Sequence, residues 1–301
     1  MKFSTVGTFK QMNNQNQKLK KMTNEQLKKL QKVLVEIMDD IDFVCKKYKL
    51  IYNLGGGSCL GAIRHKGFIP WDDDMDINMP RADYEIFCQK FMEEFGEKYW
   101  LHTPEKTKNL GIAFARVRKK GTIFLSREDL TNTEEAGVYI DIFIIENTYN
   151  LKFMRYIHGF LSMASGFLLS CRNFYKNRKF YLEIVKDDKS TKKIFGVKIF
   201  IGFLLSWISV DKMTHMWNNI NKMCKNNNSK YITVPVGRNH FFGELYKRED
   251  FCNVVTHEFE KRNFYVCKEY DKYLSHMYGN YMEIPKDADK ETHIFLNLKL
   301  D

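Results

Sequence analysis

The sequence lacks the cysteine spacing of a disulfide-bonded or zinc-binding protein. Its seven cysteines are odd in number, and no two of them form a Cys-x-x-Cys pair. This pattern argues against a disulfide framework and against a zinc cluster, so we expect reduced thiols. The sequence also has no Gly-x-Ser-x-Gly elbow, and its eight histidines are scattered, so nothing supports a serine triad or a haem site.

Long apolar segments are missing as well. Residues 1–22 are polar and rich in Asn, Gln and Lys, without the apolar stretch of a secretory signal, so we expect a flexible cytoplasmic tail. The two most apolar runs, Ile157–Ser170 and Ile194–Ser209, are shorter than the about 20 residues that span a bilayer. We therefore expect a cytoplasmic protein, either free or peripheral on the inner face of the membrane.

The charge is strongly positive and unevenly distributed. The chain of 301 residues has a net charge of +11, which favours an anionic partner such as a nucleic acid, a membrane surface or a phosphate-bearing substrate. Residues 151–210 hold 11 Lys and Arg against three Asp and Glu, so this segment carries most of the excess. Its apolar runs are either core helices or interfacial helices on an anionic membrane, with Phe203 and Trp207 as anchors.

The periodicity of the first half predicts alternating helices and strands. A capping box at Thr23–Gln26 opens an apolar-striped helix that runs to about Tyr48. Glycines then interrupt a short strand, and the alternation continues to a buried strand near residue 140. We predict an α+β fold with a mixed β-sheet flanked by helices. The further elements predicted are strands at 50–54, 74–79, 138–145 and 231–236, helices at 81–99 and 213–224, and a hairpin over 112–125.

Four carboxylates fall within the five residues from Asp72 to Asp76. In a strand, Asp72, Asp74 and Asp76 would point to the same side, where their mutual repulsion calls for a cation. Mg²⁺ or Mn²⁺ prefers such oxygen ligands. The alternative is a solvated acidic loop, which fits poorly because apolar residues flank the run on both sides.

A glycine turn, Gly56-Gly57-Ser58, precedes the acidic run and leads into a helical stretch. Such a turn presents backbone N–H groups to a phosphate. The basic run Arg64-His65-Lys66 lies between the two motifs and adds positive charge, although a solvent-exposed surface is the simpler role for these side chains. Together the motifs predict a site where a metal and a phosphate meet.

A third carboxylate is predicted at Asp141, the single charge within an apolar strand. A buried Asp needs a partner, and a shared metal ion with the acidic run would supply one. The alternative partner is a structural salt bridge to Arg116 or Arg118. These two arginines are also candidates for contact with the phosphate-bearing substrate.

These motifs together resemble the LicD family of phosphocholine transferases, whose distant relatives include the fukutin-type ribitol-phosphate transferases. The resemblance implies a nucleotidyltransferase fold and covers residues from about 25 to 150 and from about 240 to the end. The strings that carry it are Leu54-Gly55-Gly56-Gly57-Ser58, Trp71-Asp72-Asp73-Asp74-Met75-Asp76, Arg81-Ala82-Asp83-Tyr84, Gly137-Val138-Tyr139-Ile140-Asp141 and Tyr278-Gly279-Asn280-Tyr281. One departure is Asn280, where we expect the family to have Asp, so Tyr278 and Gly279 are assigned to packing.

The chain is accordingly divided into a tail at 1–22, a catalytic core at 23–150, a helical basic and apolar insertion at 151–230, and a part at 231–301 that completes the domain. The resemblance implies transfer of a phospho-alcohol, phosphocholine first, from a cytidine-diphosphate-linked donor to a hydroxyl of a glycan or its lipid-linked precursor. Asp74, Asp76 and Asp141 would be catalytic and would hold the metal together with Asp72.

Two other functions share these features. True nucleotidyl transfer would use the same metal motif and release pyrophosphate. A basic protein with a relic fold, bound to membrane or RNA, would need none of the carboxylates, and their intact set argues against it. We do not expect a nucleic-acid partner.

Overall fold

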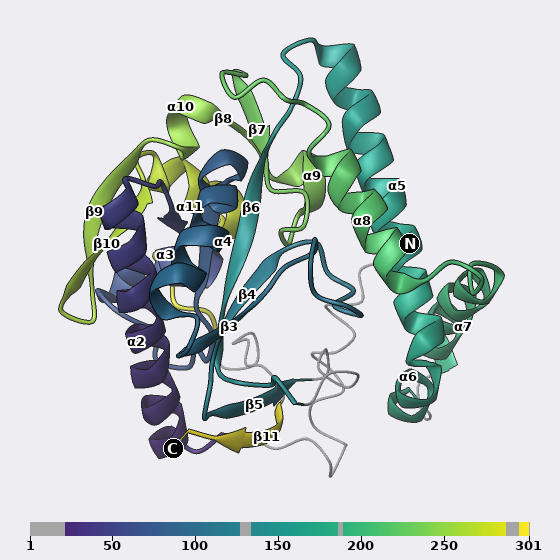
Figure 1. Ribbon diagram of the computed structural model, residues 1–301, viewed down its shortest axis with the longest axis horizontal. Helices are drawn as coiled ribbons and strands as arrows, with labels where there is room; N and C mark the ends of the chain where they lie inside the picture. Colours follow the sequence, from purple (N-terminus) through teal and green to yellow (C-terminus); the bar gives the residue numbers. More distant parts are fainter. Residues whose placement is uncertain (1–21, 127–133, 186–188, 287–294, 301) are drawn as a thin grey trace.

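The computed structural model describes residues 22–126, 134–185, 189–286 and 295–300 (Figure 1). The predicted tail therefore lies outside the described residues except for Met22. A mixed β-sheet flanked by helices forms the body of the molecule, and a long helical segment packs against one side of it, as the sequence predicts.

The main sheet contains seven strands among the described residues. Its order is β1-β2-β6-β4-β3, and β7 pairs with both β6 and β8. Strands β9 and β10 form a separate hairpin, and β11 pairs with β5. The strands are β1 (Asn53–Leu54), β2 (Asp76–Pro80), β3 (Tyr99–His102), β4 (Ala115–Lys119), β5 (Ile123–Ser126), β6 (Tyr139–Asn147), β7 (Tyr231–Thr233), β8 (Leu245–Lys247), β9 (Val254–Phe259), β10 (Arg262–Cys267) and β11 (Phe295–Lys299).

The helices fall into two groups, one around the sheet and one beside it. Helices α2, α3, α4 and α11 surround the sheet, whereas α5 to α8 extend to one side (Figure 1). The bounds are α2 (Asn24–Tyr48), α3 (Gly56–His65), α4 (Arg81–Phe95), α5 (Lys152–Lys176), α6 (Arg178–Ile184), α7 (Lys189–Leu204), α8 (Val210–Asn221), α9 (His240–Gly243), α10 (Arg248–Phe251) and α11 (Tyr270–Tyr278).

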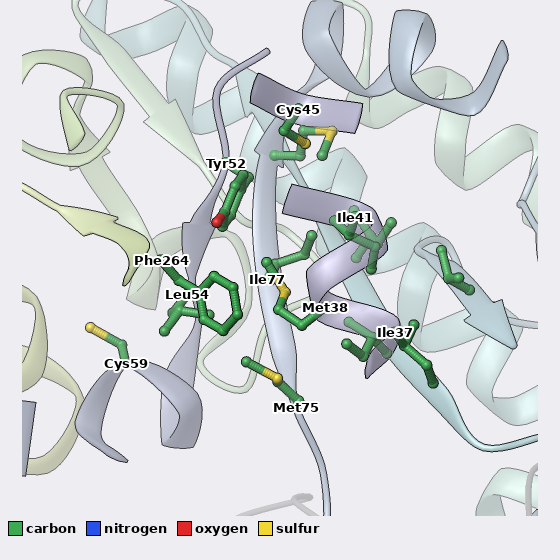
Figure 2. Packing of buried hydrophobic residues seen from close by; sticks show 14 of the residues in the cluster. Ile37, Met38, Ile41, Cys45, Tyr52, Leu54, Cys59, Met75, Ile77 and Phe264 are labelled. Atoms are coloured by element: carbon green, nitrogen blue, oxygen red, sulfur yellow. The ribbon is translucent and has the colours of Figure 1, made fainter. Parts of the chain in front are cut away.

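Helix α2 begins and packs as its sequence predicts. The Thr23 hydroxyl accepts a hydrogen bond from the Gln26 backbone, and the Gln26 side chain accepts one from the Thr23 backbone. Such a box satisfies N–H groups that a helix start leaves unpaired. The apolar stripe of α2 is fully buried at Ile37 and Ile41 and packs against Ile77 of the sheet (Figure 2).

Strands β2 and β6 lie side by side in the middle of the sheet and run parallel. Their register pairs Asp76 with Asp141, so two predicted site residues occupy neighbouring positions. Both strands are mostly buried and carry apolar side chains at most positions, as is typical of central strands.

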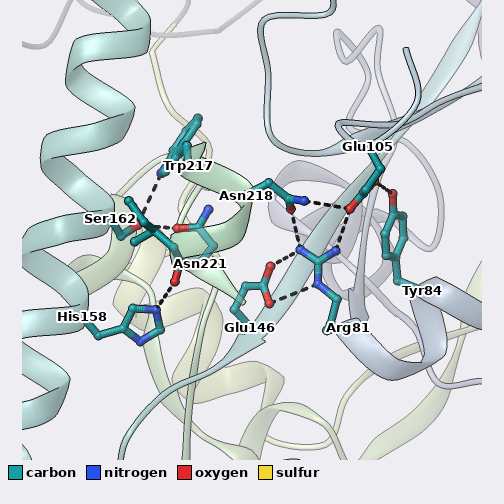
Figure 3. Close-up of polar contacts among 10 residues, drawn as sticks. Arg81, Tyr84, Glu105, Glu146, His158, Ser162, Trp217, Asn218 and Asn221 are labelled. Carbon is teal, nitrogen blue, oxygen red and sulfur yellow. Dashed lines mark hydrogen bonds and ion pairs between the residues drawn. The ribbon is translucent and has the colours of Figure 1, made fainter. Parts of the chain in front are cut away.

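We call the segment from α5 to α8 the helical arm. It is tied to the sheet by a buried polar network at the far end of β6 (Figure 3). Arg81 at the start of α4 forms an ion pair with Glu146 of β6 and donates to Asn218 of α8 at 2.8 Å. Asn218 in turn donates to Glu105 at 2.9 Å. Within the described ranges, no helix combines the length and apolarity that crossing a bilayer requires.

Several predicted elements differ from the structure. Strand β2 begins at Asp76, so Asp72 and Asp74 lie in the preceding segment and not on one strand face. Helix α4 ends at Phe95, because Tyr99 starts β3. Strands β1 and β7 are shorter than predicted, because each pairs with its neighbour over only a few residues.

The predicted hairpin at 112–125 is wrong. Strand β4 pairs with β3 and β6, while β5 pairs with β11. Residues 136–138 pass between β4 and β5: the Lys119 N–H donates to the Val138 carbonyl, and the Phe124 N–H donates to the Ala136 carbonyl. The intervening segment takes the hydrogen bonds that a hairpin would have formed within itself.

Candidate active site

A cavity of about 440 Å³ opens between the start of α3, the acidic run and the C-terminal part of the chain. It joins three stretches that are far apart in the sequence. They contribute the glycine turn, the carboxylates before and at the start of β2, and aromatic and charged residues from 234 onward. The lining side chains used below are Gly56, Gly57, Arg64, Trp71, Asp72, Asp74, Asp76, Phe143, Arg238, Glu244, Tyr273, Tyr278 and Tyr281.

The glycine turn forms the first turn of helix α3 and not a loop before it. Gly55 is the N-cap, and Gly56 has a φ of +41°, a conformation that favours glycine. A Cβ atom on Gly57 would lie 2.9 Å from an Asp72 carboxylate oxygen. Glycine at this position therefore lets an acidic side chain lie against the positive end of the α3 dipole.

Three carboxylates of the acidic run converge beside this helix start. Asp72, Asp73 and Asp74 each offer an oxygen, and these atoms lie within 4.8 Å of one another. Burial raises the pKa of Asp72 well above its usual range, and the neighbouring Asp74, Asp73 and Asp76 raise it further. Hard oxygen donors held this close suit Mg²⁺ or Mn²⁺, because a cation would relieve both burial and repulsion.

The composition of this cluster differs in part from the predicted set. Asp73 was not among the predicted ligands, yet it is buried and belongs to the cluster. Asp76, two residues after Asp74, lines the same cavity. Its backbone N–H donates a hydrogen bond to the Ser58 hydroxyl at 2.9 Å. Ser58 thus links α3 to β2, and it does not line the cavity.

Asp141 lies next to Asp76 in the sheet but carries a different contact. Its carboxylate accepts hydrogen bonds from Arg116, at 2.6 Å from Nε and 3.1 Å from Nη2. Both partners are buried, and neither lines the cavity, whereas Phe143 two residues further along β6 does. The salt bridge offered above as the alternative for Asp141 is therefore present. Arg116 also stacks on the ring of Tyr139, 4.1 Å from its centroid.

The predicted cationic residues separate into two groups. Arg64 lines the cavity and donates to the carbonyls of Tyr281 and Glu283, at 2.6 and 3.2 Å. His65 lies beside it, 3.0 Å from the Arg64 Nε, and burial together with this neighbour lowers its pKa.

The other two cationic candidates point elsewhere. Lys66 is exposed and pairs with Glu258 at 3.5 Å, so it does not reach the cavity. Arg118 is buried over the ring of Tyr139 and donates to the Gly137 carbonyl at 3.2 Å. Its position on β4 directs it away from the cavity, toward the segment that separates β4 from β5.

Residues from the last third of the chain complete the cavity, although the sequence analysis assigned none of them to the site. The Tyr273 hydroxyl accepts a hydrogen bond from the Gly56 N–H at 2.8 Å. Tyr278, assigned above to packing, lines the cavity, and its hydroxyl lies 3.4 Å from the position of a Cβ on Gly56. A motif at 278–281 was visible in the sequence, but nothing in it indicated a cavity.

Glu244 is the least expected member of the site. Only 3% of its surface is exposed, and its carboxylate accepts a hydrogen bond from the Asn239 N–H at 3.0 Å. Burial raises the pKa of Glu244 from 4.5 to about 7. A carboxyl group in such an environment favours a cationic ligand, which would restore its ionised form. Arg238 lines the same wall.

Comparisons with known proteins identify similar chains. A family model described as "LicD/FKTN/FKRP, nucleotidyltransferase domain" matches residues 49–158, which include the glycine turn, the acidic run and Asp141. The lipopolysaccharide cholinephosphotransferase LicD of Haemophilus influenzae is 30% identical over 288 residues, covering 91% of this chain and 97% of the relative. An uncharacterized protein of Rickettsia prowazekii is 34% identical over 77 residues, covering 26% of this chain and 29% of that protein.

Proposed function

We propose, because the chain belongs to the LicD family, that it transfers phosphocholine from a cytidine-diphosphate-linked donor to a hydroxyl of a cell-surface glycan or its lipid-linked precursor. Membership makes the chain a transferase of phosphate-containing groups. The observation that carries the finer proposal is one cavity that joins a glycine-lined helix start, a carboxylate cluster and an aromatic wall.

The donor's diphosphate would lie at the start of α3. There the helix dipole favours negative charge. Arg64, in the last turn of α3 and fixed by two carbonyls, adds a positive charge to the lining of the cavity. These groups would hold the phosphates in line for attack by the acceptor hydroxyl.

Asp72, Asp74 and Asp76 would hold Mg²⁺ or Mn²⁺. When bound, this ion would neutralise the charge that develops as the bond to the nucleoside monophosphate breaks. Asp73 would support the cluster from its buried position. Asp141 already has its two oxygens on Arg116, so its better-supported role is to fix the strand that carries Asp76 in place.

The choline group would lie against the aromatic wall. Trp71, Tyr278 and Tyr281 line the cavity, and rings of this kind attract a quaternary ammonium through the negative faces of their π systems. Glu244 would supply a formal negative charge on the same cavity wall as Arg238. A donor with a neutral alcohol would lack both attractions.

The test is a screen of cytidine-diphosphate alcohols with purified protein, with and without Mg²⁺ or Mn²⁺. We expect metal-dependent release of cytidine monophosphate with the choline donor, at a rate above that with the ribitol or glycerol donor. Release of pyrophosphate from cytidine triphosphate would show nucleotidyl transfer instead. No turnover of any donor, with or without metal and a glycan acceptor, would exclude the proposal.

A further inference from the structure

The first part of helix α5, up to Phe167, has polar residues inside and large apolar residues outside. His158, Ser162 and Ser165 are buried on the side that packs against α8 and α9. His158 contacts the Thr148 hydroxyl and the Ile220 carbonyl. Ser162 donates a hydrogen bond to Asn221 at 2.6 Å (Figure 3). The polar side of α5 is therefore fully used within the chain.

The opposite side of α5 exposes large apolar side chains. Phe153, Ile157, Phe160 and Phe167 recur at helical spacing, and Phe153 and Phe160 are 69% and 70% exposed. A helix in an aqueous protein usually shows the reverse arrangement. Exposing this side to water alone has no physical advantage, so it indicates a partner.

Helix α7 continues the same inversion. Its one charged residue near the middle, Lys198, is buried against Ser170 and the ring of Phe174, while Phe200 and Phe203 are exposed. Trp207, just after the helix, is 80% exposed. Of the 24 large apolar side chains that are exposed among the described residues, 15 lie between Leu151 and Trp207, so this is one concentrated surface and not scattered exposure.

Helix α7 packs beside α5, so the exposed residues of the two helices belong to neighbouring elements. The ring of Phe203 on α7 lies 5.7 Å from Tyr175 on α5, and Lys198 lies 6.0 Å from the ring of Phe167. We call this surface the outer face of the arm, defined by Phe153, Ile157, Phe160, Phe167, Phe200, Phe203 and Trp207.

Positive charge accompanies the outer face. Lys152 lies at the start of α5, and Arg178, Lys179, Lys192 and Lys193 lie where α6 and α7 begin; all five are exposed. Among the described residues from Leu151 to Trp207, the acidic side chain is that of Glu183, which is exposed. Rings and bases arranged in this way match a bilayer with anionic headgroups, where rings enter the interface and bases meet phosphates.

We propose that the outer face of the arm docks onto an anionic phospholipid bilayer. A second copy of this chain is a poorer occupant, because two surfaces with the same excess of bases repel each other when they face. The bilayer supplies both the apolar phase and the opposite charge. This inference does not depend on the proposed reaction.

Helix α5 connects the outer face of the arm to the segment that lines the cavity. The segment that contains Gly237, Arg238 and Glu244 lines the cavity, and helix α9 within it packs against α5. The ring of Phe242 on α9 lies 5.5 Å from Tyr156, beside the outer face. One short segment and helix α5 itself thus lie between the cavity and the proposed membrane contact.

The test is flotation of the full chain with vesicles. One set contains phosphatidylglycerol in phosphatidylcholine, and the other contains phosphatidylcholine alone, at low and high salt. A triple variant, F153S/F160S/W207S, removes three exposed rings of the outer face. A charge variant, K179Q/K192Q/K193Q, keeps the rings. The matched control, I51S/I86S/M92S, removes three exposed apolar side chains that lie outside the arm.

We expect the wild type and the matched control to float with the anionic vesicles, and high salt to weaken the binding. The triple variant should partition at least about ten-fold more weakly. The charge variant should lose the preference for phosphatidylglycerol, which keeps the proposal testable if the triple variant does not fold.

Three results would overturn the proposal. They are a wild type that stays with neither vesicle set, a triple variant that floats like the wild type, and a wild type that is dimeric by light scattering and becomes monomeric in the triple variant. Release of cytidine monophosphate from a soluble donor is measured on the same samples. A failure of docking is then distinguishable from a failure of the proposed reaction.

Discussion

In the sheet half of the molecule, side chains such as Ile77 and Ile142 are completely buried and acids line a cavity. In the helical arm, Ser162 and His158 are buried and Phe160 faces outward. One large apolar core holds the sheet half together, whereas the arm has two small clusters with three buried apolar residues each. The comparison teaches that one apolar core stabilises the sheet half, whereas the described part of the arm depends on small clusters and on polar contacts with the sheet half.

The largest effect should come from removing an acid of the cavity. Asp74→Ala should lower kcat by at least about 10³-fold, because it takes away a carboxylate of the proposed metal cluster. The unfolding midpoint should change little, since the apolar core is untouched. Steady-state release of cytidine monophosphate gives kcat, and urea denaturation gives the midpoint.

The matched acid for this experiment is Asp211 of the arm, whose carboxylate accepts the Asn109 N–H. Asp211→Asn should keep near-normal kcat in solution. A large loss of kcat in Asp211→Asn, or normal kcat in Asp74→Ala, would show that the chemistry is not confined to the sheet half.

The next effect should be one of stability, at the ion pair beneath the cavity. Asp141→Asn leaves the buried guanidinium of Arg116 without its anionic partner, and we expect the free energy of unfolding to fall by about 4 kcal/mol. The measurement is guanidinium denaturation with two probes. Glu25→Gln, which removes an exposed pair with Lys29, is the control and should change stability little. A stable but inactive Asp141→Asn protein would mean that Asp141 holds the metal, as the sequence predicted.

A smaller, pH-dependent effect is expected at Glu244. Because burial raises its pKa from 4.5 to about 7, the folded protein retains this proton longer than the unfolded chain does. The free energy of unfolding should therefore fall by about 3 kcal/mol as the pH rises from 4.5 to 7. Above pH 7 this contribution should change little.

Glu244→Gln cannot ionise and should lack this fall. Its stability relative to the wild type should rise between pH 5 and pH 8, as followed by denaturation at several pH values. If the variant and the wild type give parallel profiles, Glu244 is not held in the protonated form and its place in the cavity wall needs another explanation.

The smallest effects compare two glycines, one from each half. Gly196→Ala on α7 places a methyl group in open space and should stabilise the arm by about 1 kcal/mol without changing kcat. Gly57→Ala pushes on the Asp72 carboxylate, so the gain in helix propensity should be cancelled and kcat should fall about ten-fold. If the two variants change stability and kcat to the same extent, the first turn of α3 is no more sensitive to an added methyl group than α7 is.

The parts of the site that are contiguous in the sequence were predictable, and the distant parts were not. The glycine turn and the acidic run could be recognised in the sequence. The acidic run is conspicuous because four carboxylates lie between apolar residues, where their charges would be costly to bury. Their secondary structure was less accessible: the run precedes β2, because a strand of consecutive acids facing one another would be unstable without a cation.

Glu244 and Tyr278 could not be predicted, because their role arises only when the last third of the chain folds back over α3. No local pattern distinguishes Glu244 from the other acids. For the arm, the sequence left core helices and interfacial helices as alternatives. Periodicity alone does not say which side of a helix is covered, and the buried serines of α5 decide against a simple core helix.

The network around Arg81 has a consequence for exchanging parts between members of the family. Asn218 of the arm satisfies both Arg81 and Glu105 of the sheet half. A chimera that brings in a foreign arm without an amide at this position would leave buried polar groups unsatisfied, at a penalty of about 1–3 kcal/mol. The outward residues of the arm carry no such restriction. The hydrogen bonds to the sheet half therefore restrict an exchange at position 218, where the transplanted arm must supply an amide, and they do not restrict its exposed positions.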